Sequence, residues 1–318
     1  MRILFVGAGA VGGYFGSRLA AAGRDVSFLV HRGRAEALRR DGLRVALGPA
    51  PDAATEVLHD VHAVVADGST PVGGPFDVIV VAVKAYALDA ALDDIEPFVG
   101  PDTMVLPLLN GLRHIDTLVA RFGEHRVLGG LCVVAAQLDP DGTVRLLAPG
   151  ATITYGELDG SLSPRIRALD EQFQLPAPAD GGFKARASQQ IEADLWSKWV
   201  FLSSGGAVTT LLNGTVGQIT ATPTGPETAR AIVAECAAVA AASGFALPPR
   251  SIEAVERQVT EPGSGFTTSM YRDLQAGRPV EADAIVGDLV ARAASLGVSV
   301  PLLSAAYARL RVYVDGRA

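Results

Sequence analysis

Short apolar runs alternate with helix-like segments through the first half of the chain. Buried strands are predicted by four runs rich in β-branched residues: RILFV, DVSFLV, DVIVVAV and TMVLPLL. Residues 11–22, between the first two runs, have the pattern of a helix. This alternation predicts a mostly parallel sheet with helices on both faces. The later runs RVLGGLCVVAAQ, TVRLLA and TITYGEL predict additional strands that close one edge of the sheet.

The pattern changes between residues 158 and 184, which are rich in Pro, Asp, Ser and Gly and contain one helix-like stretch at 165–173. Exposed, polar segments of this kind separate domains. We therefore expect one domain at 1–182 and a second at 183–318.

In the second domain apolar residues recur at three- and four-residue intervals, beginning with Ile191, Leu195, Trp199 and Leu202. This is the spacing of one buried helix face. Further helices are predicted at 227–243, 250–259, 265–276, 279–296 and 301–313. The second domain is therefore expected to be all-α.

Composition excludes several classes of protein. The chain has 318 residues, 49% of them apolar and 19% charged, which is typical of a globular protein of two domains. A net charge of -7 repels a phosphate backbone and argues against nucleic acid as a partner. The Ala-rich stretch 231–247 contains Glu235 and is too polar to predict a membrane span. Cys132 and Cys236 lie in apolar contexts without metal or disulfide spacing, so we expect free thiols and a cytoplasmic protein with no signal peptide.

A glycine-rich turn lies directly between the strand RILFV and the helix at 11–22. Its first glycine permits a tight turn, its second lets the backbone approach a pyrophosphate, and its third allows close packing of helix and strand. The N-terminus of the helix then offers N–H groups to phosphates. The pattern predicts a dinucleotide site made by Gly7, Ala8, Gly9, Ala10, Val11 and Gly12.

The end of the second strand indicates which dinucleotide binds. A site for NAD places an acid there, on the ribose 2′-hydroxyl, whereas this chain has His31-Arg32-Gly33-Arg34. Guanidinium groups form charge-assisted bonds to phosphate, so we expect Arg32 to bind the 2′-phosphate and NADPH to be the cofactor. The alternative is that Arg32 and Arg34 are solvated loop charges. His31 is expected to shape the loop.

Several motifs beyond the glycine turn point to one family. They are VAVKAYAL around Lys84, LLNGL around Asn110, ITYGE at 153–157, LWSKWVF around Lys198 and TTSMYRDLQAGRPVEADAIVG at 267–287. With them the chain resembles the ketopantoate reductase (2-dehydropantoate 2-reductase) family over almost its whole length. The resemblance implies an α/β Rossmann domain and an all-helical domain, which together reduce a branched 2-keto acid with NADPH.

The resemblance also implies roles for single residues. Lys198 would donate the proton and Glu281 would orient the substrate, while Ser269 would touch it. Asn110 and Lys84 would lie at the nicotinamide end of the cofactor, and Asn110 would also contact the substrate. Because hydride addition to a ketone leaves an alkoxide, an acid such as a lysine ammonium suits this chemistry.

Each of these residues also has an ordinary interpretation. Lys198 could point to solvent, and Glu281 could be an acid in a first helical turn that begins near Pro279. Asn110 could form a simple turn with Gly111, and Lys84 could cap neighbouring carbonyls.

The sequence departs from the family pattern where substrate-binding amides are expected. Those positions hold Leu202 and Gly206, and the segment before Ser269 reads Gly265-Phe266-Thr267. Asn213 remains as a substrate-binding candidate, or as a turn residue. Since hydrogen-bonding sites discriminate strongly through those bonds, we expect the reduction to be retained with a different substrate, either a bulkier or more apolar 2-keto acid or another carbonyl compound.

Two other functions stay open at this point. A different two-domain dehydrogenase would commonly use a histidine, but no histidine follows His125. A sensor could retain NADPH binding without turnover. The Ala-rich helix at 231–243 permits close packing against a second copy, which favours a homodimer, but it fits a core within one chain as well.

Overall fold

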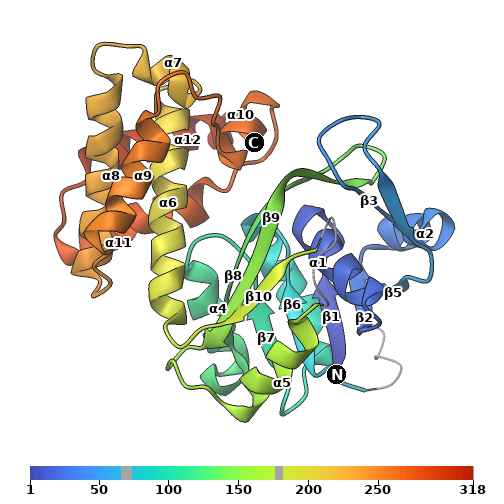
Figure 1. Cartoon of the computed structure of the whole chain (residues 1–318). Coiled ribbons are helices and arrows are strands. Elements are labelled where there is room, and N and C mark those ends of the chain that lie inside the picture. Colours follow the sequence, from blue (N-terminus) through green and yellow to red (C-terminus); the bar gives the residue numbers. More distant parts are fainter. Residues whose placement is uncertain (66–73, 176–181, 318) are drawn as a thin grey trace. The chain divides into compact units, whose positions relative to one another are not determined.

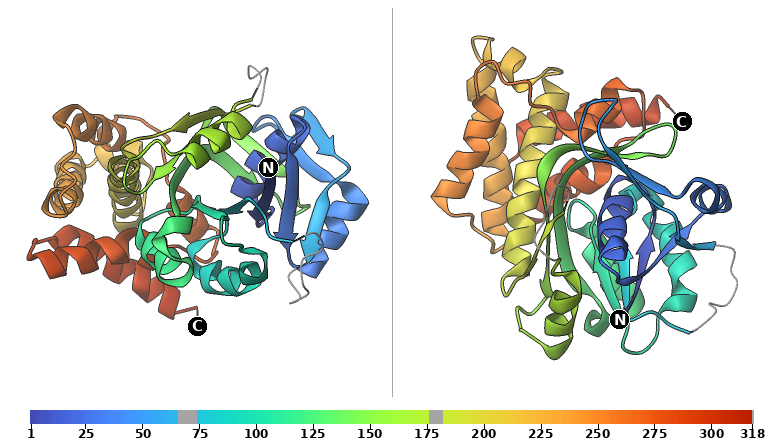
Figure 2. Two further views of the ribbon diagram at one scale, coloured as in Figure 1. Left: turned by 90° about the horizontal axis from the view of Figure 1, so that it is seen from below. Right: turned by 45° about the vertical axis from the view of Figure 1, so that its right-hand side comes forward.

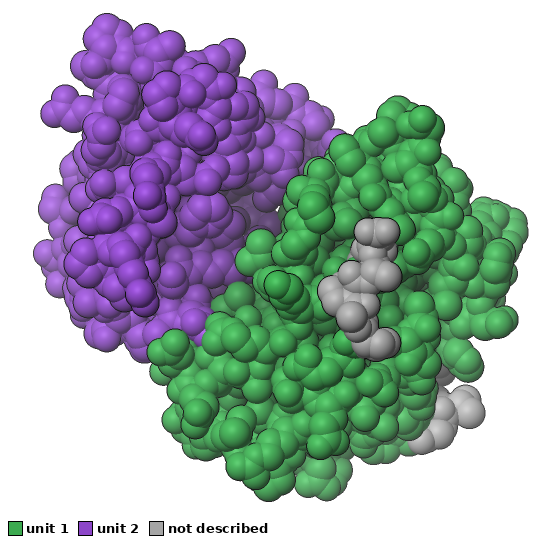
Figure 3. Space-filling view, viewed as in Figure 1, with its two compact units in different colours: residues 1–109, 114–192 green, residues 110–113, 193–318 purple. Residues whose placement is uncertain are grey.

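A computed structural model describes residues 1–65, 74–175 and 182–317. The described chain forms two compact units, one of residues 1–109 and 114–192 and one of residues 110–113 and 193–318 (Figure 3). The first unit extends beyond the expected boundary at 182 because β10 (Lys184–Ala187) still pairs with β9 (Val144–Glu157). Part of the Pro-rich stretch that suggested the boundary, residues 176–181, lies outside the described residues.

The main sheet of the first unit is parallel throughout the described residues, in the order β5-β2-β1-β6-β7. Its strands are β1 (Arg2–Val6), β2 (Asp25–Val30), β5 (His62–Val65), β6 (Val78–Val81) and β7 (Met104–Pro107). Successive side chains of β1 enter opposite cores: Ile3 and Phe5 join one cluster, and Leu4 and Val6 join the other. Both faces are therefore buried, as the continuous apolar runs predict.

Helices cover the two faces of this sheet (Figure 1). On one face lie α1 (Ala10–Ala21) and α2 (Arg32–Asp41), and on the other α3 (Leu88–Ile95) and α4 (Arg113–Phe122). The parallel α/β architecture expected from the sequence is confirmed.

A second sheet takes up the later strands. The runs TVRLLA and TITYGEL form one continuous strand, β9, which pairs along its length with β8 (Leu128–Leu138). β9 also pairs with β10 and with β3 (Leu43–Ala46), and β3 pairs with β4 (Thr55–Leu58). These strands therefore build a sheet of their own that packs on α1, instead of only closing an edge of the first. In the part of the chain that the structure describes, an isolated parallel bridge pairs Val127, just before β8, with Val105 of β7 at the edge of the main sheet.

The second unit is helical in its described residues, as expected. Its helices are α6 (Ile191–Leu211), α7 (Val216–Thr220), α8 (Gly225–Ala242), α9 (Pro249–Thr260), α10 (Ser269–Gln275), α11 (Asp288–Leu296) and α12 (Pro301–Asp315). Helix α8 lies beside α9 in both Figure 1 and Figure 2 and also contacts α11 and α12. The core includes Trp199, Ile232, Val286 and Leu303.

One helix in this unit departs from the expected pattern. The stretch 279–296 is not a single helix from Pro279, because a π-helical turn, η4 (Asp283–Gly287), precedes α11. Likewise the helix expected from residue 265 begins at Ser269, where the side chain of Thr268 accepts a hydrogen bond from the amide of Tyr271.

Both cysteines are free and buried, as expected. Burial raises the pKa of the Cys236 thiol to about 12, and Cys132 is only 6% exposed. We expect neither thiol to react with Ellman's reagent in the native protein, because the reactive thiolate is absent or inaccessible. Both should react after unfolding in guanidinium chloride; rapid native reaction of either thiol would contradict its burial. Within the described ranges, no helix has the length and apolarity needed to cross a bilayer.

Candidate functional site

The glycine turn joins β1 to α1, and each of its three glycines is favoured over a larger residue for a different structural reason. Gly7 has a φ of +94°, a left-handed conformation that residues with a Cβ rarely adopt. A Cβ on Gly12 would lie 2.1 Å from the carbonyl oxygen of Gly7, so a larger residue would force the turn apart. A Cβ on Gly9 would have no atom within 4 Å apart from those of the adjacent residues, so the backbone of Gly9 faces open space. The turn is closely packed at Gly12 and open to approach at Gly9.

The N-terminus of α1 is suited to an anion. Its N-cap residue, Gly9, supplies no capping side chain, and the first turn carries no acidic residue. The amide of Gly13 donates to the Gly9 carbonyl at 2.8 Å, which leaves the amides before it directed out of the helix end. These N–H groups and the positive end of the helix dipole are what a phosphate requires.

Two further glycines in α1 set its position between the two sheets. A Cβ on Gly16 would lie 2.5 Å from the Phe28 ring of β2, and one on Gly13 would lie 2.8 Å from Val144 of β9. Close helix–strand packing therefore occurs at Gly13 and Gly16, whereas a glycine at position 12 avoids a clash with the carbonyl oxygen of Gly7 in the turn. The sequence motif ends at Gly12, and the run GGYFG beyond it was the signal for this second role.

The two arginines that open α2 have different surroundings. His31 is the N-cap residue, and its Nδ1 accepts from the amide of Arg34 at 3.2 Å, which agrees with the expected loop-shaping role. Arg32, the first residue of α2, is exposed. The Nη2 of Arg34 donates to the carbonyl oxygens of Ala8 and Gly142, each at 3.1 Å. The interpretation of both residues as solvated loop charges is therefore wrong for Arg34.

Lys84 lies near the same end of the sheet. It is exposed and begins the 3₁₀ turn η1 (Ala85–Ala87) just after β6. The residues before it border the glycine turn, because a Cβ on Gly7 would lie 3.4 Å from both the Ala82 carbonyl oxygen and Val83 Cγ1. The first unit therefore gathers the glycine turn, the start of α2 and the loop of Lys84 at the carboxyl ends of β1, β2 and β6.

Asn110 belongs to the second unit. The chain leaves the first unit after Leu109 and returns to it at His114. Gly111 has a φ of +83°, and a Cβ there would lie 2.2 Å from the carbonyl oxygen of Ala284. Asn110 and Gly111 thus form a turn, and that turn packs tightly against η4.

Lys198 lies on α6 beside a fixed contact with η4. It is half-buried, and the next residue, Trp199, is 1% exposed. Trp199 Nε1 and Ser203 Oγ both donate to the carbonyl oxygen of Ile285, at 2.9 and 3.0 Å. A π-helical turn shifts its carbonyls out of α-helical register, so these two donors hold it in place. Sequence reasoning missed Ser203, which carries no motif of its own.

Glu281 stands just before η4. It is 8% exposed, and its backbone carbonyl accepts from the amide of Ile285 at 3.1 Å. The helix begins at Ala282, so Pro279 is not its first residue, and Glu281 stands directly before the helix, still at the end where a carboxylate favours the helix dipole. Lys198 and Glu281 thus lie on segments that contact each other within the second unit. Lys198 is part of α6, and Glu281 directly precedes η4, whose Ile285 carbonyl accepts two hydrogen bonds from α6.

Ser269 begins α10, and Asn213 follows the end of α6. A Cβ on Gly205 would lie 3.1 Å from Thr268, next to the exposed Ser269, and Gly205 is two turns, about 10 Å, from Lys198. Asn213 follows the end of α6 with a φ of +54°, and its Oδ1 accepts from Gln275 at 2.9 Å. The structure thus gives Asn213 a turn conformation more than three helical turns from Lys198.

The positions that lack the expected amides have apolar neighbours. A Cβ on Gly206 would lie 2.6 Å from the terminal methyl of Met270, which is 3% exposed. The ring of Phe201, on α6, lies 6.4 Å from the ring of Phe266, in the segment before α10. This wall offers apolar contacts in place of amide hydrogen bonds.

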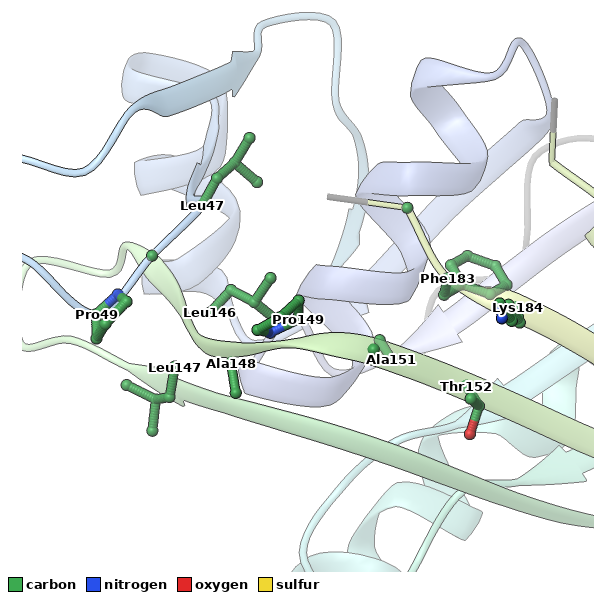
Figure 4. A pocket seen from close by; sticks show the side chains of 13 residues that line it. Leu47, Pro49, Leu146, Leu147, Ala148, Pro149, Ala151, Thr152, Phe183 and Lys184 are labelled. Carbon is green, nitrogen blue, oxygen red and sulfur yellow. The ribbon is translucent and has the colours of Figure 1, made fainter. Parts of the chain in front are cut away.

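A groove of about 490 Å³ lies elsewhere in the first unit, between β9 and the segment after β3 (Figure 4). Leu47, Pro49, Leu146 and Phe183 line it. None of the candidate residues is among its lining residues, so we assign no function to it.

Comparisons with known proteins agree over the whole chain. Residues 3–160 match the family model described as ketopantoate reductase PanE/ApbA, and residues 190–314 match that of its C-terminal part. The uncharacterized oxidoreductase YkpB of Bacillus subtilis is 36% identical, covering 98% of this chain and 99% of that protein. A 2-dehydropantoate 2-reductase of Mesorhizobium japonicum is 28% identical, covering 98% and 97%. The crystal structure of 2-dehydropantoate 2-reductase from Geobacter metallireducens aligns with a TM-score of 0.84 at 28% identity, covering 98% and 99%.

Proposed function

The chain belongs to the ketopantoate reductase family, and we propose from this premise that it reduces a small 2-keto acid to the 2-hydroxy acid with NADPH, using Lys198 as the general acid. Membership makes it an oxidoreductase of the 2-dehydropantoate 2-reductase type, in a family of NAD(P)-dependent dehydrogenases. The observation that carries the proposal is Lys198 itself. It is a half-buried amine beside the contact that ties α6 to the Glu281 segment.

The cofactor assignment is supported by the first unit. The turn from Gly7 to Gly12 and the uncapped start of α1 suit the pyrophosphate. Arg32, exposed at the start of α2, suits the 2′-phosphate, since a guanidinium forms charge-assisted hydrogen bonds to phosphate oxygens. Lys84 and Asn110 are assigned to the nicotinamide end. When bound, the reduced dinucleotide supplies the hydride.

The composition of the chain supports lysine chemistry. The chain contains 24 arginines but only three lysines, Lys84, Lys184 and Lys198, and its second unit has no histidine. Arginine stays protonated near neutral pH, so Lys198 is the one basic side chain of the helical unit that can give up a proton there. Lys198 Nζ would donate its proton to the carbonyl oxygen as negative charge develops there.

The remaining polar candidates would hold the substrate. We assign Glu281 to orienting it and Ser269 and Asn110 to contacting it. Asn213 was also predicted to bind substrate, but its hydrogen bond with Gln275 and its distance along α6 favour the turn role. The apolar neighbours at Gly206 and Phe266 support a substrate with a bulky or apolar side chain.

The direct test is NADPH oxidation, followed at 340 nm, with a panel of 2-keto acids that ranges from ketopantoate to aryl and branched-chain members. We expect turnover of at least one, with apolar side chains preferred. A protein that binds NADPH but turns over none of a broad panel would instead support a sensor.

Arg32→Ala is predicted to weaken NADPH binding about tenfold and leave NADH binding unchanged, because NADH lacks the 2′-phosphate that the guanidinium is proposed to bind. The ratio of the two dissociation constants, measured by titration calorimetry, checks this. Arg40→Ala is the matched control, since Arg40 lies on the same helix and pairs with Asp41. An unchanged ratio in Arg32→Ala would remove Arg32 from the cofactor site.

The homodimer and the cytoplasmic location stay predictions. Analytical ultracentrifugation of the purified chain would test the first.

A further inference from the structure

Arg34 joins three segments of the first unit that are far apart in the sequence. It belongs to the first turn of α2, yet its guanidinium reaches Ala8 in the glycine turn and Gly142 in the turn between β8 and β9. A single nitrogen, Nη2, donates to both carbonyl oxygens at 3.1 Å. The conformation of the glycine turn is therefore tied to the second sheet through one side chain.

The turn between β8 and β9 is shaped to admit this guanidinium. Gly142 has a φ of +82°, and a Cβ on it would lie 2.5 Å from Nη1 of Arg34. Both the backbone conformation and the room for Arg34 thus require glycine at this position. The neighbouring Asp141 accepts hydrogen bonds from the amide and hydroxyl of Thr143, at 3.0 Å each, which fix the turn.

The surroundings of Arg34 differ from those of a solvated surface charge. Its side chain is partly buried, and its Nε is buried without a hydrogen-bond partner among the described residues. Burial lowers the pKa of Arg34, and the negative charge of Asp141 only partly offsets this. Burying a guanidinium costs free energy unless hydrogen bonds compensate for it, and the hydrogen bonds of Arg34 go to the carbonyl oxygens of Ala8 and Gly142.

We propose that Arg34 is a positioning residue for the dinucleotide: through Ala8 it holds the glycine turn in the conformation that receives the pyrophosphate. It does so without choosing between NADPH and NADH, because the pyrophosphate is common to both. Arg32, two residues earlier, faces solvent and acts on the 2′-phosphate alone. This inference rests on the proposed function in so far as the glycine turn is taken as the dinucleotide site.

The two arginines can be separated by binding alone. In Arg34→Ala we expect the dissociation constants of NADPH, NADH and ADP-ribose all to rise about tenfold, with the NADPH-to-NADH ratio unchanged. In Arg32→Ala only the NADPH value should rise. Arg39→Ala is the matched control, because Arg39 also lies on α2 and donates to a backbone carbonyl, that of Ala63, away from the glycine turn.

A second variant disrupts the contact between Arg34 and Gly142 by changing Gly142 instead of Arg34. Gly142→Ala should displace the Arg34 guanidinium and give the same uniform loss of affinity, and adding Arg34→Ala to it should cause little further loss. Hydrogen exchange in the dinucleotide-free protein should show faster exchange of the amides of residues 7–13 in both variants, but not in Arg39→Ala. If Arg34→Ala does not fold, Arg34→Lys replaces it, since an ammonium cannot reproduce the fork of a guanidinium.

The outcomes separate this inference from the proposed function. Binding in the wild type that is unchanged in Arg34→Ala and Gly142→Ala would overturn the positioning role and leave the reductase proposal intact. A change in the NADPH-to-NADH ratio in Arg34→Ala would overturn it too, by making Arg34 a 2′-phosphate ligand. A wild-type chain that binds none of the three ligands would overturn both proposals.

Discussion

Lys198→Ala is expected to lower kcat for reduction of the 2-keto acid by about 10²–10⁴-fold, because the alkoxide oxygen loses its proton donor. The dissociation constant of NADPH should stay unchanged, since the residues proposed to grip the phosphates lie in the other unit. Stopped-flow measurement of NADPH oxidation in a single turnover would isolate the chemical step. Lys184→Ala provides the matched control, because Lys184 is an exposed lysine on β10 with no proposed catalytic role.

Lys198→Arg sharpens this test. Arginine preserves the positive charge but holds its proton too tightly for general acid catalysis near neutral pH. We therefore expect Lys198→Arg to recover little of the lost rate if proton donation is the role of Lys198, and much of it if only charge is needed. Full activity in Lys198→Ala would rule out both roles.

Gly12→Ala and Gly9→Ala are expected to separate folding from cofactor binding within one turn. In Gly12→Ala the new methyl would collide with the Gly7 carbonyl oxygen, 2.1 Å away, so the free energy of unfolding should fall by about 2–4 kcal/mol. In Gly9→Ala the methyl meets open space, so the free energy of unfolding should change by about 1 kcal/mol or less. That methyl would stand where the phosphates approach, and affinity for dinucleotide should fall at least about tenfold.

Urea unfolding followed by circular dichroism would give the free energies, and calorimetry the affinities. Equal stability of Gly12→Ala and the wild type would mean that the turn relaxes easily around a side chain. Unchanged NADPH affinity in Gly9→Ala would show that the dinucleotide does not approach the turn at this residue.

The sequence alone predicts the main sheet and the helical domain because their signals are local. Each strand of the main sheet that was predicted is a continuous apolar run, and the faces of α6 and α8 repeat at helical intervals. The strands β3, β4 and β5 are as short as β6 and β7, but their sequences LRVA, TEVL and HAVV are interrupted by polar residues or begin with one, so they do not stand out as continuous apolar runs. Their pairing, like the merging of two runs into β9, is decided by contacts between distant parts of the chain.

The site shows the same division. The glycine turn is recognisable in the sequence because its spacing follows from local backbone geometry. Lys198 and Glu281 were identified only through the family resemblance. Arg32 and Arg34 have the same side chain at neighbouring positions, and only tertiary structure shows that one is exposed and the other reaches Ala8 and Gly142. The π-helical turn after Glu281 could not be predicted, because the carbonyl of Ile285 depends on donors from Trp199 and Ser203 in another helix.

Because residues 110–113 belong to the second unit, the two units cannot be expressed separately by cutting the chain at a single position. These four residues come from the first half of the coding sequence but are part of the second unit, where Leu112 packs against the helical core and Gly111 fits against Ala284. A fragment that begins at residue 193 would lack residues 110–113 and leave apolar surface around Trp199 exposed. Split reporters and domain-swapped chimaeras made from this chain should therefore carry the loop over together with the C-terminal half.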